Sequence, residues 1–264
     1  AFNQAVRTPT PIELSCADPE FECRLPNAFL ADPPLEQVVV DNLETGLRGW
    51  HEQWSWQMAL FYSRNKNDII FQSTGGTQGN QGFFDNIDST HRLGANIVVK
   101  GDWSDVSWYA NYSYLKATYG DDWLVSSPNH PSADESGQLL VEKGDSLPGL
   151  PEHSLQAGID YALTPQFSMS VEGQFSSSVY LRGDEANRMS QISSYATFSM
   201  DAVYQLTERV ILTARIDNLF DREYDSFGLL GEPDEVLGDD FDNPVFLSRG
   251  APRAAWLGIR LRLD

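Results

Sequence analysis

Apolar and polar residues alternate with a period of two along most of this chain. In the stretch 210–217, apolar side chains occupy the even positions, and Thr213, Arg215 and Asp217 lie between them. Successive side chains of a β-strand point to opposite faces, so the pattern predicts strands with one apolar and one polar face. It recurs at 43–47, 54–62, 92–99, 106–114, 155–161, 167–175, 198–204 and 255–263. We therefore expect nine full strands after a short opening strand, and we find no helical pattern of comparable length.

The connections between these expected strands alternate in length. Short ones are expected at 49–53, 100–105, 163–166 and 206–209, and long ones at 9–37, 72–85, 120–151, 181–192 and 222–250. Alternating short turns and long loops along antiparallel strands are typical of bacterial outer-membrane barrels, where the short turns are periplasmic and the long loops extracellular. The apolar face would then meet lipid, and the polar face would line a wet or protein-filled lumen.

Aromatic residues gather at the ends of the expected strands. Beside the short turns lie Trp50, Trp54, Trp103, Trp108, Tyr161, Phe167 and Tyr204, and beside the long loops lie Tyr119, Tyr180, Tyr195 and Phe220. Two such bands are typical of the aromatic girdles at the two lipid interfaces. A soluble β-sandwich would instead bury its aromatic residues in mid-strand.

The charge balance and the ends of the chain narrow the choice of function. The 264 residues carry 38 acidic and 18 basic side chains, for a net charge of -20, and the acidic excess gathers in the Pro- and Gly-rich long loops. Nucleic-acid binding is not expected, because phosphate backbones attract basic surfaces. No run of 18 apolar residues predicts a transmembrane helix. The chain begins at Ala1 without a signal-peptide pattern, so we expect a fragment or a processed chain.

Cys16 and Cys23 are the two cysteines, and Pro19 lies between them in a polar loop. This arrangement predicts a small disulfide and an oxidising compartment, the alternative being two unrelated thiols. A zinc site would need two further ligands, and the four histidines show no ligand spacing. We expect no cofactor and no resident metal.

The stretch RIDNLFDREYDSFG, residues 215–228, resembles the Asn-Leu-Phe-Asp-x-x-Tyr motif near the end of TonB-dependent outer-membrane receptors. Other segments resemble landmarks of that family in the same order: FNQAVRTPTPIEL (2–14), NLETGLRG (42–49), FYSRNKNDII (61–70), NIDSTHRLGANI (86–97), GDSLPGLPEHSLQAGIDY (144–161) and GAPRAAWLGIRLRLD (250–264). Together they cover essentially all of the chain.

The resemblance implies an all-β fold, an antiparallel transmembrane β-barrel in the outer membrane of a Gram-negative bacterium. Residues 1–264 would be the C-terminal part, about 9–10 strands, of a 22-stranded barrel, and would lack the plug and the TonB box. The whole receptor would take up a scarce, bulky ligand, most commonly an iron–siderophore complex, with cobalamin, haem or oligosaccharides as other cases. Its partners would be its own N-terminal plug and barrel half, the TonB complex acting through the plug, and outer-membrane lipid and lipopolysaccharide.

The resemblance also suggests where binding residues lie. Inward polar residues would contact the plug or simply hydrate the lumen: Asn42, Glu44, Arg48, Asn96, Asn111, Glu172, Asp201, Arg215 and Asp217. Ligand contacts would come from the long loops, with these candidates: Arg182, Asp184, Glu185, Asn187, Asp239 and Asp240. Their alternative role is a solvated loop tip. The acidic cluster at 232–242 could bind Ca²⁺ but lacks the spacing of a calcium loop.

A rival interpretation is a complete small outer-membrane barrel of about ten strands, either a passive porin or an enzyme with a site at its rim. A rim enzyme would need Ser/His or Asp/His pairs on neighbouring strand ends. His91 and His130 have no obvious partners in the sequence, and no Gly-x-Ser-x-Gly motif occurs. We therefore expect a transport protein without catalytic residues.

Overall fold

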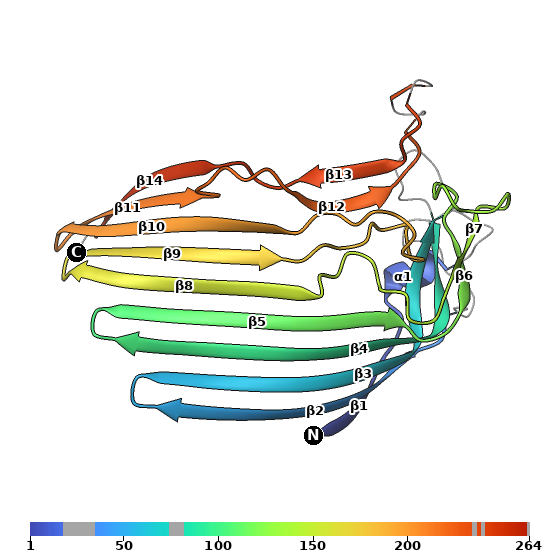
Figure 1. Ribbon diagram of the computed structural model, residues 1–264, viewed down its shortest axis with the longest axis horizontal. Coiled ribbons are helices and arrows are strands. Elements are labelled where there is room, and N and C mark those ends of the chain that lie inside the picture. The colour runs from blue at the N-terminus through green and yellow to red at the C-terminus, as the bar shows by residue number, and fades with distance from the viewer. Residues whose placement is uncertain (18–34, 74–81, 234–236, 239–240, 263–264) are drawn as a thin grey trace.

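An open antiparallel sheet of ten strands forms most of the molecule (Figure 1). The computed structural model describes residues 1–17, 35–73, 82–233, 237–238 and 241–262. The strand order is β1-β2-β3-β4-β5-β8-β9-β10-β11-β14, so each strand pairs with the next one along the sheet. Within the described residues, β1 and β14 are the two edges and do not pair with each other. The predicted all-β antiparallel fold is confirmed.

The sheet strands are β1 (Phe2–Arg7), β2 (Val38–His51), β3 (Trp54–Ser73), β4 (Gly82–Trp103), β5 (Val106–Tyr119), β8 (His153–Thr164), β9 (Phe167–Ser176), β10 (Tyr195–Thr207), β11 (Val210–Asp217) and β14 (Ala254–Leu261). Two separate hairpins are β6 (Trp123–Ser126) with β7 (Gln138–Val141), and β12 (Asp225–Leu230) with β13 (Val245–Arg249). The helix α1 (Pro11–Ser15) is one short turn capped by Thr10. No described helix is long and apolar enough to cross a membrane.

The short turns all lie at one end of the sheet, and the long connections gather at the other (Figure 1). We call the latter end, formed by α1, β6, β7, β12, β13 and the connections around them, the loop cluster. One predicted length is wrong: β3 continues to Ser73 and β4 begins at Gly82, so both ends of the connection expected at 72–85 are strand. Phe71 pairs with Phe84 there, and their rings pack edge to face at 5.3 Å.

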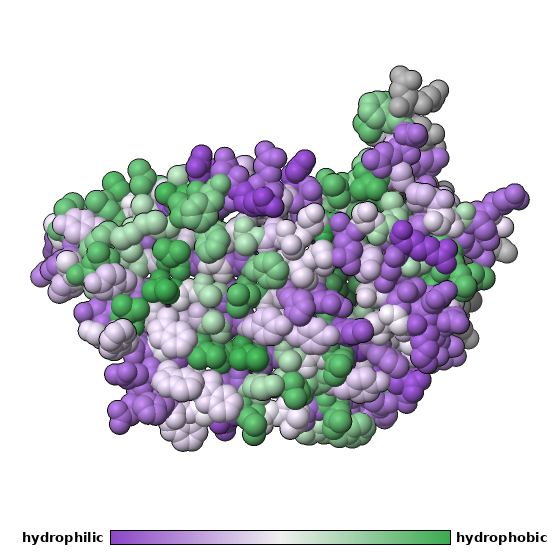
Figure 2. Space-filling model, in the orientation of Figure 1, coloured by the Kyte–Doolittle hydropathy of each residue, from purple (hydrophilic) through white to green (hydrophobic). Residues whose placement is uncertain are grey.

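The register confirms the two predicted faces. Asp201 pairs with Arg215, and Thr213 pairs with Gly258, on the polar face. On the other face, Leu257 is 89% exposed and Ile259 is 72% exposed. Exposed apolar surface of this extent marks an interaction with a partner or a membrane. Figure 2 shows hydrophobic side chains gathered over the strands and hydrophilic ones gathered over the loop cluster.

The aromatic band beside the short turns lies on the apolar face, except for Trp50, which pairs with Ser55 on the polar face. The band expected beside the long loops needs a correction. Tyr119 is only 2% exposed, because the β6–β7 hairpin covers it with Val125 and Leu139. At this end, the apolar face instead carries Tyr62, Tyr112 and Tyr114.

Buried apolar side chains occur mainly in the loop cluster. One group joins the ends of β4 and β5 to the β6–β7 hairpin: Ile87, Ala117, Tyr119, Val125, Leu139, Val141, Leu147 and Ala186. Two smaller groups are Ala17, Leu35, Val38 and Ile69, and Leu181, Ile192 and Leu230. The loops are therefore folded on one another, and they hold the candidate ligand residues in fixed positions.

Candidate functional site

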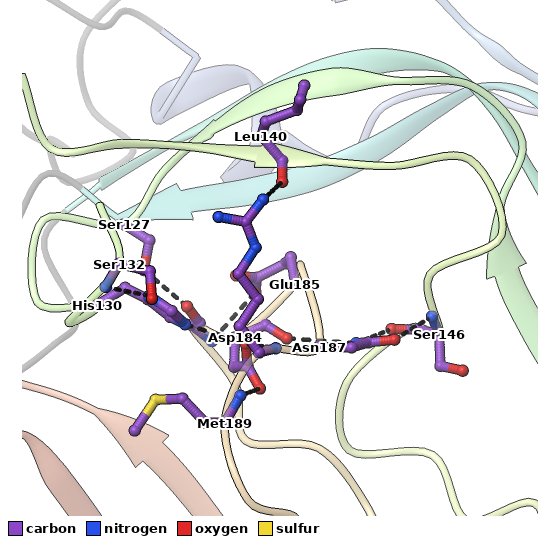
Figure 3. A network of polar contacts seen from close by, with 11 residues as sticks. Ser127, His130, Ser132, Leu140, Ser146, Asp184, Glu185, Asn187 and Met189 are labelled. Carbon is purple, nitrogen blue, oxygen red and sulfur yellow. Dashed lines mark hydrogen bonds and ion pairs between the residues drawn. The ribbon is translucent and has the colours of Figure 1, made fainter. Parts of the chain in front are cut away.

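Asp184 is the centre of a polar network that fixes the loop between β9 and β10 (Figure 3). Its side chain is completely buried. One carboxylate oxygen accepts a hydrogen bond from the backbone N–H of Arg188 at 2.8 Å, and the other accepts one from Met189 at 3.0 Å. His130 Nε2 lies 3.0 Å from Oδ1. All these contacts are internal, so Asp184 positions the loop and offers no oxygen to a ligand.

His130 comes from the connection between β6 and β7 and is also completely buried. Its Nδ1 accepts a hydrogen bond from the backbone N–H of Ser132 at 3.0 Å. The proton of the neutral ring is therefore on Nε2, which donates to Asp184. The structure thus supplies the Asp/His pair that a rim enzyme would need, but both ring nitrogens are occupied and shielded. The pair therefore links two loops and cannot take a proton from a substrate.

Further bonds join the β9–β10 loop to the β6–β7 connection and also to the connection between β7 and β8. Asn187 Oδ1 accepts from the backbone N–H of Ser146 at 2.6 Å, and Asn187 Nδ2 donates to the Ser146 carbonyl at 3.0 Å. Ser127 Oγ donates to the carbonyl of Gly183 at 2.7 Å. Asn187 adopts a left-handed backbone, which asparagine tolerates better than most residues. Its amide is therefore used for the fold.

A cavity of about 260 Å³ opens beside this network. Its walls come from β3, β4, β6, β12 and the loop that Asp184 fixes, and they include Phe71, Phe84, Val125, Arg182, Glu185 and Leu229. The guanidinium of Arg182 lies over the ring of Phe71, 5.2 Å from the ring centre. A cation above an aromatic face is held by the ring quadrupole and still offers N–H donors to a ligand.

Glu185 is the one acidic side chain of the cavity wall among the described residues, and it is 7% exposed. Its Oε1 accepts a hydrogen bond from the backbone N–H of Gly183 at 3.1 Å, whereas Oε2 has no hydrogen-bond partner. Burial raises the pKa of this carboxyl, and backbone hydrogen bonds oppose the rise. Buried polar atoms are normally bonded, so this unpaired carboxylate oxygen is an exception within the described residues.

The structure therefore gives the predicted loop residues two different positions, at the cavity wall and behind it. Arg182 and Glu185 line the cavity, whereas Asp184 and Asn187 support it from behind. Three of the predicted residues lie outside the described residues: Asp239, Asp240 and Cys23. Ligand binding by the two aspartates therefore stays a prediction, and so does the disulfide between Cys16 and Cys23. Cys16 itself is 2% exposed. The sequence did not predict that Phe71 lines a cavity or that His130 and Asp184 form a pair. The spacing of these residues along the chain does not indicate either contact.

The nine predicted lumen residues share one face of the sheet, as the pairing shows from β2 across to β11. Some are linked: Glu172 accepts from Tyr109 at 2.6 Å and from Gln156 at 3.0 Å, and Arg215 bonds Asp217 at 2.8 Å. The nine do not converge on one point. Asn42, Glu44 and Arg48 lie on β2, far across the sheet from Arg215. They form a polar surface and not a compact site, and their contact with a plug stays a prediction.

Comparisons with known proteins all lead to one family. The model of the TonB dependent receptor-like β-barrel matches residues 1–219. The pesticin receptor of Yersinia enterocolitica is 25% identical over 214 residues, which are 78% of this chain and 28% of that protein. The pesticin receptor of Yersinia pestis matches over the same share.

Solved structures share the fold. The copper transporter OprC superposes with a TM-score of 0.68 at 16% identity, over 98% of this chain and 36% of that one. The ferric yersiniabactin uptake receptor FyuA from Yersinia pestis gives 0.66 at 17% identity, over 98% and 34%. A mutant of the ferric enterobactin receptor PfeA from Pseudomonas aeruginosa gives 0.65 at 17% identity, over 98% and 37%. The chain thus spans about a third of the relatives that it matches.

Proposed function

The chain belongs to the TonB-dependent receptor family, whose β-barrel it matches over most of its length, and we propose that it serves in the uptake of an iron–siderophore complex across the outer membrane. Relatives named for ferric uptake, such as FyuA and PfeA, support the choice of ligand. In this proposal residues 1–264 form the C-terminal part of the barrel. The plug, the rest of the barrel and the contact with the TonB complex belong to the remainder of the receptor.

The two faces of the sheet fit this role. The apolar face, with its band of aromatic side chains, would meet outer-membrane lipid, and the polar face would surround the plug. The ligand would approach from the loop cluster, because long loops are extracellular in such barrels and the strands are joined by two-residue turns at the opposite end. The net charge of -20 makes nucleic acid an unsuitable partner.

The observation that carries the proposal is the cavity beside Arg182, Phe71 and Glu185. Pockets for drug-sized ligands measure about 300–1,000 Å³, so a cavity of about 260 Å³ suits one arm of a bulky ligand and not the whole molecule. Ferric siderophore complexes commonly carry negative charge and aromatic arms. Arg182 supplies a cation and Phe71 a flat apolar wall, and Glu185 adds a carboxyl group whose pKa is raised by burial.

The rival rim enzyme has less support. Its required Asp/His pair is present as Asp184 and His130, but the pair is buried and saturated with hydrogen bonds. The family match likewise leads to receptors and transporters. We infer that this chain moves a ligand and breaks no bond.

Binding of iron complexes to cells that carry the full receptor tests the proposal. Radioactive iron would be offered on a panel of catecholate, hydroxamate and mixed siderophores. For the preferred complex we expect Arg182→Ala to weaken binding at least tenfold and Arg253→Ala, which removes an exposed cation outside the cavity, to leave it unchanged. Uptake of copper or cobalamin with no iron complex bound would overturn the choice of ligand. Equal binding of the iron complex by the two variants would show that the cavity is not part of the binding site.

A further inference from the structure

His130 and Asp184 form a buried titratable pair between the β6–β7 connection and the β9–β10 loop (Figure 3). The neutral ring of His130 matches its surroundings, because Nε2 donates to Asp184 and Nδ1 accepts from the backbone N–H of Ser132. The side chain of His130 has no exposed surface, so water does not replace either contact. The joined loops therefore fit one protonation state of the ring, the neutral one.

A protonated ring does not fit the same place. It carries N–H groups at both nitrogens and needs two acceptors. Asp184 is one acceptor, but at Nδ1 the new N–H would face the N–H of Ser132, whose nitrogen is 3.0 Å away, and a buried donor without an acceptor is destabilising. The charge of Asp184 attracts the proton, but the backbone N–H groups of Arg188 and Met189 already share that charge. We therefore expect the lost bond at Nδ1 to decide the balance.

Other charged side chains lie on the three connections that this network joins. Those that are exposed and have no role in the network are Glu135, Glu142, Lys143 and Glu152. Those that contact groups other than the His130 ring are Asp134, Asp145, Arg182, Glu185 and Arg188. Among the described residues, Asp184 is the one charged group that bonds to the ring. The contact between the two loops therefore titrates through this pair.

We propose that this pair is an acid-sensitive latch, which joins the β6–β7 connection to the β9–β10 loop near neutral pH and releases it in acid. On taking up a proton, the ring leaves its buried place, and the turn at 130–134 separates from the loop. The loop keeps the bonds of Asp184 to its own backbone and those of Asn187 to Ser146. The release is therefore local to the turn, which follows the strand that lines the cavity with Val125.

Proton linkage gives the size of the effect. A histidine in contact with water takes up a proton with a pKa of about 6.5. The released turn can take up this proton and the joined turn cannot, so the stabilisation is complete above that value and is lost as pH falls below it. Between pH 7.5 and pH 5.5, the equilibrium constant for release should therefore rise about tenfold.

Hydrogen exchange of the full receptor in detergent tests the latch at residues 130–134, after correction for intrinsic exchange rates. The variant His130→Gln keeps a donor and an acceptor but takes up no proton in this pH range. His153→Gln is the matched control, because it removes a histidine that bonds Tyr112 and leaves the latch intact. Burial raises the pKa of Glu185, so the series is repeated with Glu185→Gln to keep that carboxyl out of the comparison.

We expect exchange at 130–134 to be about tenfold faster at pH 5.5 than at pH 7.5 in the wild type and in His153→Gln, and equal at both pH values in His130→Gln. Amides of β8 and β9 should not change. Slower exchange in acid would mean that the charged pair holds the loops more tightly, and it would overturn the proposal. An unchanged rate in the wild type, the same rise in His130→Gln, or a rise across the whole sheet would overturn it as well. The result does not depend on which ligand the receptor carries.

Discussion

The strands and the loop cluster of this molecule are stabilised in different ways. On β14, at the edge of the sheet, Leu257 is 89% exposed, whereas in the loop cluster Val141 is 0% and Leu139 is 1% exposed. The strands are joined by backbone hydrogen bonds, and their apolar side chains face outward. The loops bury apolar side chains against one another, each contributing roughly 1.5–3 kcal/mol. The difference shows that the sheet is built for lipid on one face, whereas the loop cluster is built for water.

The prediction with the largest expected effect concerns membrane insertion and the two edges of the sheet. In the described structure β1 and β14 each pair with one neighbour, so each leaves a row of unpaired N–H and C=O groups. In lipid each such group costs several kcal/mol. We expect the 264 residues, expressed by themselves, not to insert stably, as shown by protease sensitivity and loss of SDS resistance. A protease-resistant, SDS-resistant monomer in outer membranes would instead support a complete small barrel.

The second prediction concerns Asp184. Replacing it with Ala leaves the partly buried backbone N–H groups of Arg188 and Met189 and the buried His130 ring without an acceptor. Each unpaired group costs about 1–3 kcal/mol, and because two of the three are only partly buried we expect a loss in the lower half of the sum, roughly 3–5 kcal/mol. Hydrogen exchange should speed up at 181–192 and stay unchanged in β8 and β9. Asp184→Asn keeps one oxygen and should lose less. Faster exchange across the whole sheet would show that the two regions are not independent.

The third prediction separates the two faces of β9. Val171→Arg places a charge on the lipid face and should cost about 2–4 kcal/mol near the midplane. Ser170→Arg, one residue away, places the same charge on the polar face beside Asp160 and Asp201. We expect only the first variant to lower the midpoint of urea unfolding in lipid vesicles. The opposite ranking would mean that the faces are reversed.

The smallest effect is the pH dependence from Glu185. Burial raises the pKa of this carboxyl from its ordinary 4.5, so the folded loop favours the neutral form. The resulting stabilisation is complete below the ordinary pKa and is lost as pH rises through the higher folded value. Hydrogen exchange at 181–192 should therefore become relatively faster as pH rises above about 4.5, after correction for intrinsic exchange rates. Glu185→Gln should remove this trend, and an identical pH profile in the variant would contradict it.

The sequence predicted the strands well because their pattern is local. Alternation between lipid and lumen repeats every second residue, so eight residues such as 210–217 are enough to assign the faces. The ends of β3 and β4 were harder to predict. There the sheet rises above the expected apolar band and packs against the loops, and Phe71 pairs with Phe84 beyond the last clear alternation.

The loop cluster could be predicted only in part. Arg182 and Glu185 were chosen for their polarity and do line the cavity. Asp184 and Asn187 were chosen on the same ground but are buried in contacts with residues 54 and 41 positions away. Burial of this kind depends on how distant loops meet. No local spacing encodes it.

The central claim is that one face of the sheet meets lipid and the other meets the lumen. Single spin labels at 198–203 on β10 of the full receptor in vesicles, read with oxygen as the lipid-soluble relaxant and a nickel chelate as the water-soluble one, test it most directly. We expect high oxygen accessibility at 198, 200 and 202, and lower values at 199, 201 and 203, where Asp201 pairs with Arg215. Uniform accessibility, or the reverse alternation, would contradict the account.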